Sequence, residues 1–251
     1  MYMKNFKYFI PNALTLINLL LGCIAIIIVF KGQNQYHAAW FILMAAVMDF
    51  LDGLVAKLLD AKSEFGVQLD SLADMVSFGV APAIIIFNWI DMVLTKLSEQ
   101  STYEWISANF SQNMVLLCSL LFAAGAAIRL ARFNVTARSQ NYFNGLPTPA
   151  AALVIASIWL IINSETKWIY TLIWNIYFVF VVLIVLVVLM VSNLKMISLK
   201  FEGFSLKKNL YRYIILSIGV ILFVLFGIEG ILYSMLLYLI LSLATQRVKT
   251  A

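Results

Sequence analysis

Long apolar segments separated by short polar stretches constrain the fold of this chain more than any other feature. Eight windows have about the length that a helix needs to cross a bilayer. They lie at about residues 11–30, 37–59, 67–90, 112–134, 148–164, 169–192, 209–228 and 230–245. Only 12% of the 251 residues are charged, against about 25% in a soluble domain. The sequence therefore predicts an all-α polytopic membrane bundle of about eight transmembrane helices.

The positions of the basic residues predict the orientation of this bundle. With the N-terminus in the cytoplasm, 14 of the 17 lysines and arginines fall on the cytoplasmic side. Since positive charge accumulates on that side, we expect a cytoplasmic (inner) membrane protein with both termini in the cytoplasm. The same distribution explains the net charge of +5 without a nucleic-acid partner. Cys23 and Cys118 lie in apolar runs, so we expect no disulfide framework.

Four aspartates interrupt the apolar pattern around the second and third windows. Asp49 and Asp52 are three residues apart, and Asp70 and Asp74 are four apart, so each pair shares one helix face. A carboxylate at bilayer depth costs roughly 2.5 to 3.5 kcal/mol, so four of them need a cation or an aqueous cavity. Oxygen ligands without histidine or cysteine suit Mg²⁺ or Mn²⁺, and proteins usually share Mg²⁺ with substrate phosphates. The aspartates therefore predict a metal site for a phosphorylated substrate.

Other residues near the aspartates leave alternatives open. Gly53 and Ala56 form a small-residue strip where either a ligand or a neighbouring helix can approach closely. His37, the only histidine, lies on the outer side, where we expect a structural role. We also expect a long outer connection over residues 91–113.

The spacing of the aspartate stretch resembles the signature of a known enzyme family. Residues 49–74 read D-x2-D-G-x2-A-K-x8-G-x3-D-x3-D, which is similar to the motif of the CDP-alcohol phosphatidyltransferases. Lys57 stands where this family usually has arginine, which keeps the charge but loses the bidentate fork. Residues 11–15 resemble the PNxxT element of the first core helix. Three further segments, 71–83, 129–134 and 145–152, resemble the bacterial phosphatidylserine synthase branch.

The resemblance implies a fold and a reaction. It implies a six-helix catalytic domain over residues 1–192, followed by a cytoplasmic loop and two more transmembrane helices over 193–251. It implies a homodimer that transfers the phosphatidyl group of CDP-diacylglycerol to the hydroxyl of L-serine and releases CMP.

The resemblance also implies roles for individual residues. Two divalent metals would be held by Asp49, Asp52, Asp70 and Asp74. Asp49 and Asp70 would bridge the metals, and Asp74 would also act as general base. Residues implied to contact CDP-diacylglycerol are Asn12, Thr15, Asp52, Gly53, Ala56, Lys57, Ser63 and Gly66. For Asn12 and Thr15 a helix start after Pro11 is an equally good explanation.

Arg129 and Arg132 are the candidates for binding the acceptor. They lie three residues apart at the cytoplasmic end of the fourth window, near the expected depth of the aspartates. We expect them to hold the carboxylate of serine. A contact to a lipid phosphate and a positive-inside anchor are the alternatives.

Two other functions compete with serine transfer. A phosphatidylglycerophosphate synthase would use glycerol 3-phosphate as acceptor and should need a denser basic pocket than this chain offers. A divalent-cation transporter would carry acidic residues in several spans and in both membrane halves. Here the four aspartates lie in adjoining helices near one face.

Overall fold

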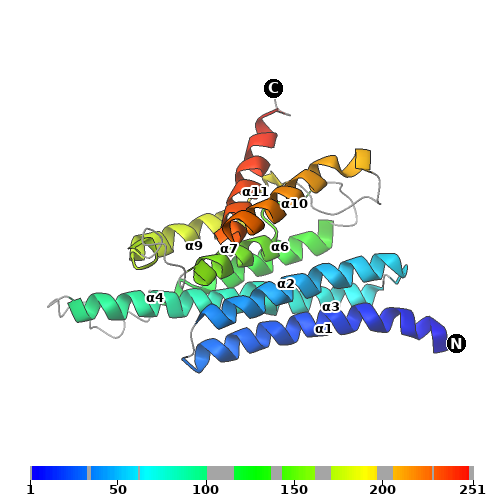
Figure 1. The fold of residues 1–251 in the computed structure, drawn as a ribbon. Helices are drawn as coiled ribbons and strands as arrows, with labels where there is room; N and C mark the ends of the chain where they lie inside the picture. The colour runs from blue at the N-terminus through cyan, green and yellow to red at the C-terminus, as the bar shows by residue number, and fades with distance from the viewer. Residues whose placement is uncertain are drawn as a thin grey trace.

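The computed structural model describes residues 2–32, 35–61, 63–100, 116–136, 143–161, 171–196, 206–227 and 229–248. Nearly all of them are helical (Figure 1). The helices are α1 (Tyr2–Phe30), α2 (Gln35–Leu58), α3 (Glu64–Asp74), α4 (Ala81–Gln100), α6 (Leu120–Thr136), α7 (Thr148–Ile161), α9 (Ile176–Val191), α10 (Leu206–Phe226) and α11 (Glu229–Val248). A π-helix, η1 (Met75–Val80), joins α3 to α4, and the two-residue strands β1 (Phe143–Asn144) and β2 (Lys195–Met196) pair antiparallel. The predicted all-α fold class is confirmed.

Helix length and apolarity identify a polytopic membrane protein. Three helical stretches within the described ranges are long and apolar enough to cross a bilayer. They are Lys7–Phe30, Tyr36–Leu58 and Glu64–Lys96. Shorter apolar helices are Thr148–Ile161, Ile176–Val191, Ser217–Phe226 and Glu229–Ser242. Each of the eight predicted windows contains helix, and the number that crosses the membrane stays a prediction.

Two predicted helix boundaries were wrong. Helix α4 continues to Gln100, so the first part of the expected outer connection is helical; residues 101–113 lie outside the described residues. The apolar pattern explains this, because Val93 is still buried in the bundle core. Helix α1 begins at Tyr2, not after Pro11. Pro11 lies inside this helix, which continues past it although proline supplies no backbone donor.

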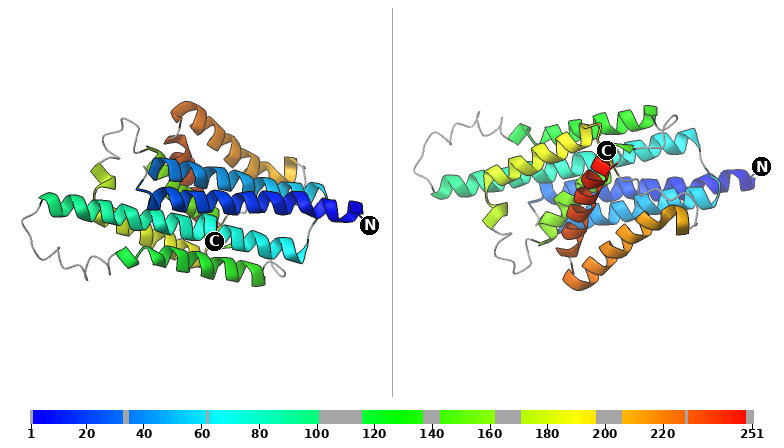
Figure 2. Two further views of the ribbon diagram at one scale, coloured as in Figure 1. Left: turned by 90° about the horizontal axis from the view of Figure 1, so that it is seen from below. Right: turned by 90° about the horizontal axis from the view of Figure 1, so that it is seen from above.

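Close packing between α1 and η1 positions the end of α3. A Cβ added at Gly22 would lie only 2.7 Å from Ser77 Cα, so glycine is needed at this crossing. At the same place Ser77 Oγ donates a hydrogen bond to the backbone carbonyl of Asn18, at 2.8 Å. Since η1 follows Asp74 directly, this contact holds the last turn of α3 against α1. Figure 2 shows α1, α2 and the α3–α4 rod side by side.

The second half of the chain packs on α4 through aromatic residues. The rings of Trp89 and Trp159 meet edge to face with centroids 5.8 Å apart, and Phe178 of α9 lies 6.2 Å from Trp89. Trp89 Nε1 also donates to the carbonyl of Ile173, at 2.9 Å. Helix α11 packs on α7 and β2, and α10 packs on α11. Figure 1 shows α11 at a steep angle to α1, α2 and α4.

Candidate functional site

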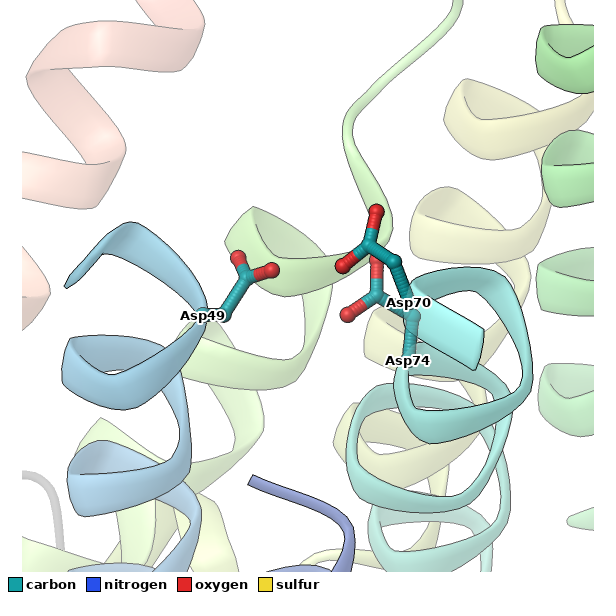
Figure 3. A group of neighbouring side chains, drawn as sticks. All are labelled: Asp49, Asp70 and Asp74. Carbon is teal, nitrogen blue, oxygen red and sulfur yellow. The ribbon is translucent and has the colours of Figure 1, made fainter. Parts of the chain in front are cut away.

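Three of the four aspartates meet between α2 and α3. Asp49 on α2 faces Asp70 and Asp74, which lie one turn apart on α3 (Figure 3). One carboxylate oxygen from each lies within 4.8 Å of the others. The helical spacing seen in the sequence therefore places three acidic groups around one point.

The fourth aspartate lies beside this group and is held by α1. Asp52 is 6% exposed and accepts a hydrogen bond from Thr15 Oγ1, at 2.6 Å. It also interacts electrostatically with Asp70 and Asp74. Thr15 thus contacts an aspartate directly, which a helix start after Pro11 does not explain.

The electrostatics of the site favour a bound cation. Asp49, Asp52 and Asp70 all repel Asp74, and Arg129 offsets only part of this repulsion. Hard divalent cations prefer carboxylate oxygens, and a bound cation removes the repulsion between neighbouring carboxylates. The oxygens of Asp49, Asp70 and Asp74 are close enough together to hold a metal ion.

Three of the predicted lipid-binding residues meet at the start of α3. Ser63 is the N-cap of this helix, and its Oγ accepts a hydrogen bond from the backbone N–H of Gly66, at 2.9 Å. A Cβ added at Gly66 would lie 3.0 Å from Ser63 Oγ and 3.2 Å from Asn12 Oδ1. Glycine therefore allows α1 and the start of α3 to approach each other.

The other predicted lipid-binding residues lie on the last turns of α2. Gly53 is exposed, and a Cβ there would meet no atom of the described residues within 4 Å. The helix-packing explanation for Gly53 therefore finds no support, and this side of α2 is open to a ligand. Ala56 is half-buried and Lys57 is exposed, one turn further on.

Arg129 reaches the aspartates from α6. It is 9% exposed and interacts electrostatically with Asp74 and Asp49. Its Nη1 donates to Thr148 Oγ1 of α7, at 3.0 Å, and its guanidinium lies 5.3 Å from the ring centroid of Phe133. Arg129 is thus a buried cation fixed beside the acidic group.

Arg132 is one turn further along α6 and contacts the end of α9. It is exposed, and its Nη1 donates to the carbonyl of Val191 at the end of α9, at 2.6 Å. A cation at that position satisfies a terminal carbonyl and the negative end of the helix dipole. Arg129 thus bonds to α7 and Arg132 to the end of α9, and the role of Arg132 in binding the acceptor stays a prediction.

Sequence reasoning missed two buried polar residues near the site. Asn18 is fully buried, and its Nδ2 donates to Asp74 Oδ1, at 3.4 Å. Its position three residues after Thr15, inside an apolar run, was a signal of the same kind as the aspartate pairs. Tyr238 of α11 is 4% exposed and interacts electrostatically with Arg129. His37 is exposed and contacts the Tyr36 ring edge to face.

Comparison with known proteins finds relatives that share one name. One relative, from Helicobacter pylori, is 35% identical over 162 residues, which are 63% of this chain and 60% of the relative. Another, from Methanocaldococcus jannaschii, is 34% identical over 62% of each chain. A third, from Saccharomyces cerevisiae, is 36% identical over 54% of this chain and 46% of the relative. All three are named CDP-diacylglycerol–serine O-phosphatidyltransferase. The matches span about three fifths or less of the length of these relatives.

The family profile covers more of the chain than these pairwise matches do. The profile of the CDP-alcohol phosphatidyltransferases matches residues 8–191, which include α1 to α9 and every aspartate of the site. The chain therefore belongs to the CDP-alcohol phosphatidyltransferase family.

Proposed function

We propose that this protein transfers the phosphatidyl group of CDP-diacylglycerol to the hydroxyl of L-serine, giving phosphatidylserine and CMP. The observation that carries this proposal is the meeting of Asp49, Asp70 and Asp74, with Asp52 beside them, next to the open side of α2. The names of the three relatives support the choice of substrates.

The aspartates would hold two divalent metals, Mg²⁺ or Mn²⁺. Asp49, Asp70 and Asp74, with Asp52 beside them, would supply the ligands. Such ions neutralise the diphosphate of the lipid nucleotide and stabilise CMP as leaving group. An all-oxygen donor set supports this choice of metal.

The CDP-diacylglycerol would lie along the start of α3 and the end of α2. Ser63 and Gly66, with Asn12 beside them, mark one edge of this path, and Thr15 fixes Asp52. The exposed face at Gly53, Ala56 and Lys57 leaves room for the nucleotide. Lys57 would contact a phosphate as a point charge, without a bidentate fork.

The chemical step needs a base beside the acceptor hydroxyl. The hydroxyl oxygen of serine would attack the phosphorus attached to diacylglycerol, and the bond from that phosphorus to the CMP oxygen would break. Asp74 would take the hydroxyl proton. Its position on the last turn of α3, held by Asn18, supports this role.

Arg129 would hold the carboxylate of serine. It is a buried cation that interacts electrostatically with Asp74. A guanidinium fork suits carboxylate recognition. Arg132, one turn further along α6, would assist Arg129 at the serine carboxylate while its Nη1 donates to the carbonyl of Val191.

The membrane placement and assembly are also proposals. The protein would lie in the cytoplasmic membrane as a homodimer, with both termini and the site at the cytoplasmic face and no nucleic-acid partner. The distribution of basic residues supports this orientation. The catalytic domain would span residues 1–192, which agrees with the extent of the family match, and residues 193–251 would add α10 and α11.

One assay tests the proposal. Purified protein in detergent micelles receives CDP-diacylglycerol, Mg²⁺ or Mn²⁺, and either L-serine or glycerol 3-phosphate, and CMP release is followed. We expect metal-dependent CMP release with serine and none in Asp70→Asn. Release only with glycerol 3-phosphate would identify the other acceptor. Metal uptake into proteoliposomes without CMP release would instead identify a transporter.

A further inference from the structure

Asn18 is a buried polar residue beside the proposed base, Asp74. It lies in the middle of α1 and is 0% exposed. Its Nδ2 donates to Asp74 Oδ1, at 3.4 Å, and its backbone carbonyl accepts a hydrogen bond from Ser77 Oγ, at 2.8 Å. Gly22 allows this close approach of α1 and η1. The side chain of Asn18 is therefore fixed beside Asp74.

The second polar atom of this amide has no protein partner. Among the described residues, nothing donates a hydrogen bond to the buried Asn18 Oδ1. The amide cannot simply turn over, because its oxygen would then face the carboxylate of Asp74. A buried acceptor without a donor is costly, so this oxygen is suited to a donor that a ligand brings.

Serine carries a donor of this kind. Its hydroxyl and its ammonium sit on adjacent carbon atoms, so the group that takes the hydroxyl proton must lie beside the group that binds the ammonium. Asp74 and Asn18 are neighbours of this kind. Arg129, which also interacts with Asp74, would face the third functional group, the carboxylate.

We propose that Asn18 Oδ1 accepts a hydrogen bond from the ammonium group of the acceptor and so selects amino alcohols over acceptors that lack an amine. This inference rests on the proposed function. Asn18 has a second role as positioning residue, because its Nδ2 orients the carboxylate of Asp74. An acceptor without an amine would leave Asn18 Oδ1 buried and unsatisfied.

The test compares L-serine with 3-hydroxypropanoate, which is serine without its amino group. In the wild-type protein we expect kcat/KM for CMP release to favour serine by roughly 10- to 100-fold, the usual cost of leaving a buried acceptor unpaired. In Asn18→Leu the ratio should fall close to one. Both acceptors need Asp74 and Arg129, so a misplaced base lowers both rates and cancels in the ratio.

Two further variants separate the amine contact from general damage. Asn18→Asp keeps an oxygen acceptor and should still prefer serine, even if turnover falls. Asn88→Leu makes the same substitution at a half-buried asparagine of α4 and should keep the wild-type ratio. If Asn18→Leu loses turnover, equilibrium binding of radiolabelled serine, competed with 3-hydroxypropanoate in the presence of CMP, gives the same ratio.

Each outcome supports or overturns the proposed contact between Asn18 and the ammonium group. A wild-type protein that uses both acceptors equally would overturn the inference whatever the variants do, as would an unchanged ratio in Asn18→Leu. A shift in metal requirement with an unchanged ratio would make Asn18 a metal ligand instead. If the wild-type protein releases no CMP with serine, the proposed function fails, which is a different result.

Discussion

The first three helices and the last two differ in the kind of polar residue that they bury. Helices α1 to α3 turn Thr15, Asn18, Asp52 and Asp74 inward, where they contact one another across helix boundaries. Helix α11 also buries polar side chains, Tyr238 and Ser242, but neither is acidic, and α10 exposes apolar side chains such as Val224. The chemistry is concentrated where α2 and α3 both pack on α1, and the C-terminal helices extend the apolar surface.

Helix α11 has one link to the site. Tyr238 is buried against the bundle and interacts electrostatically with Arg129, which is bonded to Thr148 of α7. Because α11 packs on α7, it can influence the acceptor side through Arg129. Changes in α1 to α3 should therefore affect turnover strongly, and changes in α11 should affect it weakly.

The largest effect is expected at Asp74. Asp74→Asn keeps the size of the side chain but removes the base, so CMP release should fall by about 10² to 10⁴-fold. Binding of CDP-diacylglycerol, measured by equilibrium titration, should largely remain. Asp60→Asn is the control, because Asp60 is exposed and its φ of 47° is one that asparagine tolerates. Near-normal turnover in Asp74→Asn would contradict its role as base.

A smaller loss is expected when the hydroxyl that holds Asp52 is removed. Thr15→Val deletes the hydrogen bond to this buried carboxylate, which should lower kcat/KM for CDP-diacylglycerol by roughly 10-fold or more. Thr95→Val, at an exposed position on α4, makes the same change outside the site. Equal kinetics in the two variants would mean that the Thr15 contact has no part in substrate binding.

Replacing Gly22 and Gly53 by alanine should change the stability of the fold in opposite directions. At Gly22, alanine would collide with Ser77 and should destabilise the fold by about 1 to 3 kcal/mol, visible as a lower Tm in detergent. At Gly53, alanine meets only open space and should stabilise α2 by up to about 1 kcal/mol.

The KM of Gly53→Ala for CDP-diacylglycerol provides a second test. Because Gly53 lies on the proposed nucleotide path, Gly53→Ala should raise KM for CDP-diacylglycerol while Tm stays the same or rises. A lower Tm in Gly53→Ala would contradict the open space beside α2, and a normal Tm in Gly22→Ala would contradict the close packing of α1 on η1.

The smallest effect is expected at the C-terminal helix. Tyr238→Phe keeps the buried ring and removes only the hydroxyl, so KM for serine should rise by about fivefold or less. Tyr233→Phe on the same helix removes a hydroxyl that is bonded to Glu229 instead and should leave KM unchanged. A loss as large as that of Asp74→Asn would place α11 inside the catalytic site and erase the contrast between the two regions.

The local sequence pattern was sufficient to predict much of the fold and the acidic pairs of this protein. The apolar windows, the helical class and the pairing of aspartates on helix faces follow from composition and from a period of 3.6 residues, which neighbouring residues define by themselves. Helix ends were less predictable, since Pro11 is tolerated inside α1 and α4 runs on to Gln100.

Contacts between distant segments decided the rest. The sequence alone determined that this is a membrane helical bundle with acidic pairs near one face, because both properties depend on residues a few positions apart. Only the tertiary structure decided that Asp52 turns to Thr15, that Asn18 lies against Asp74, and that Arg129 bonds to Thr148. Each of these contacts joins two different helices, so the packing of whole helices determines them.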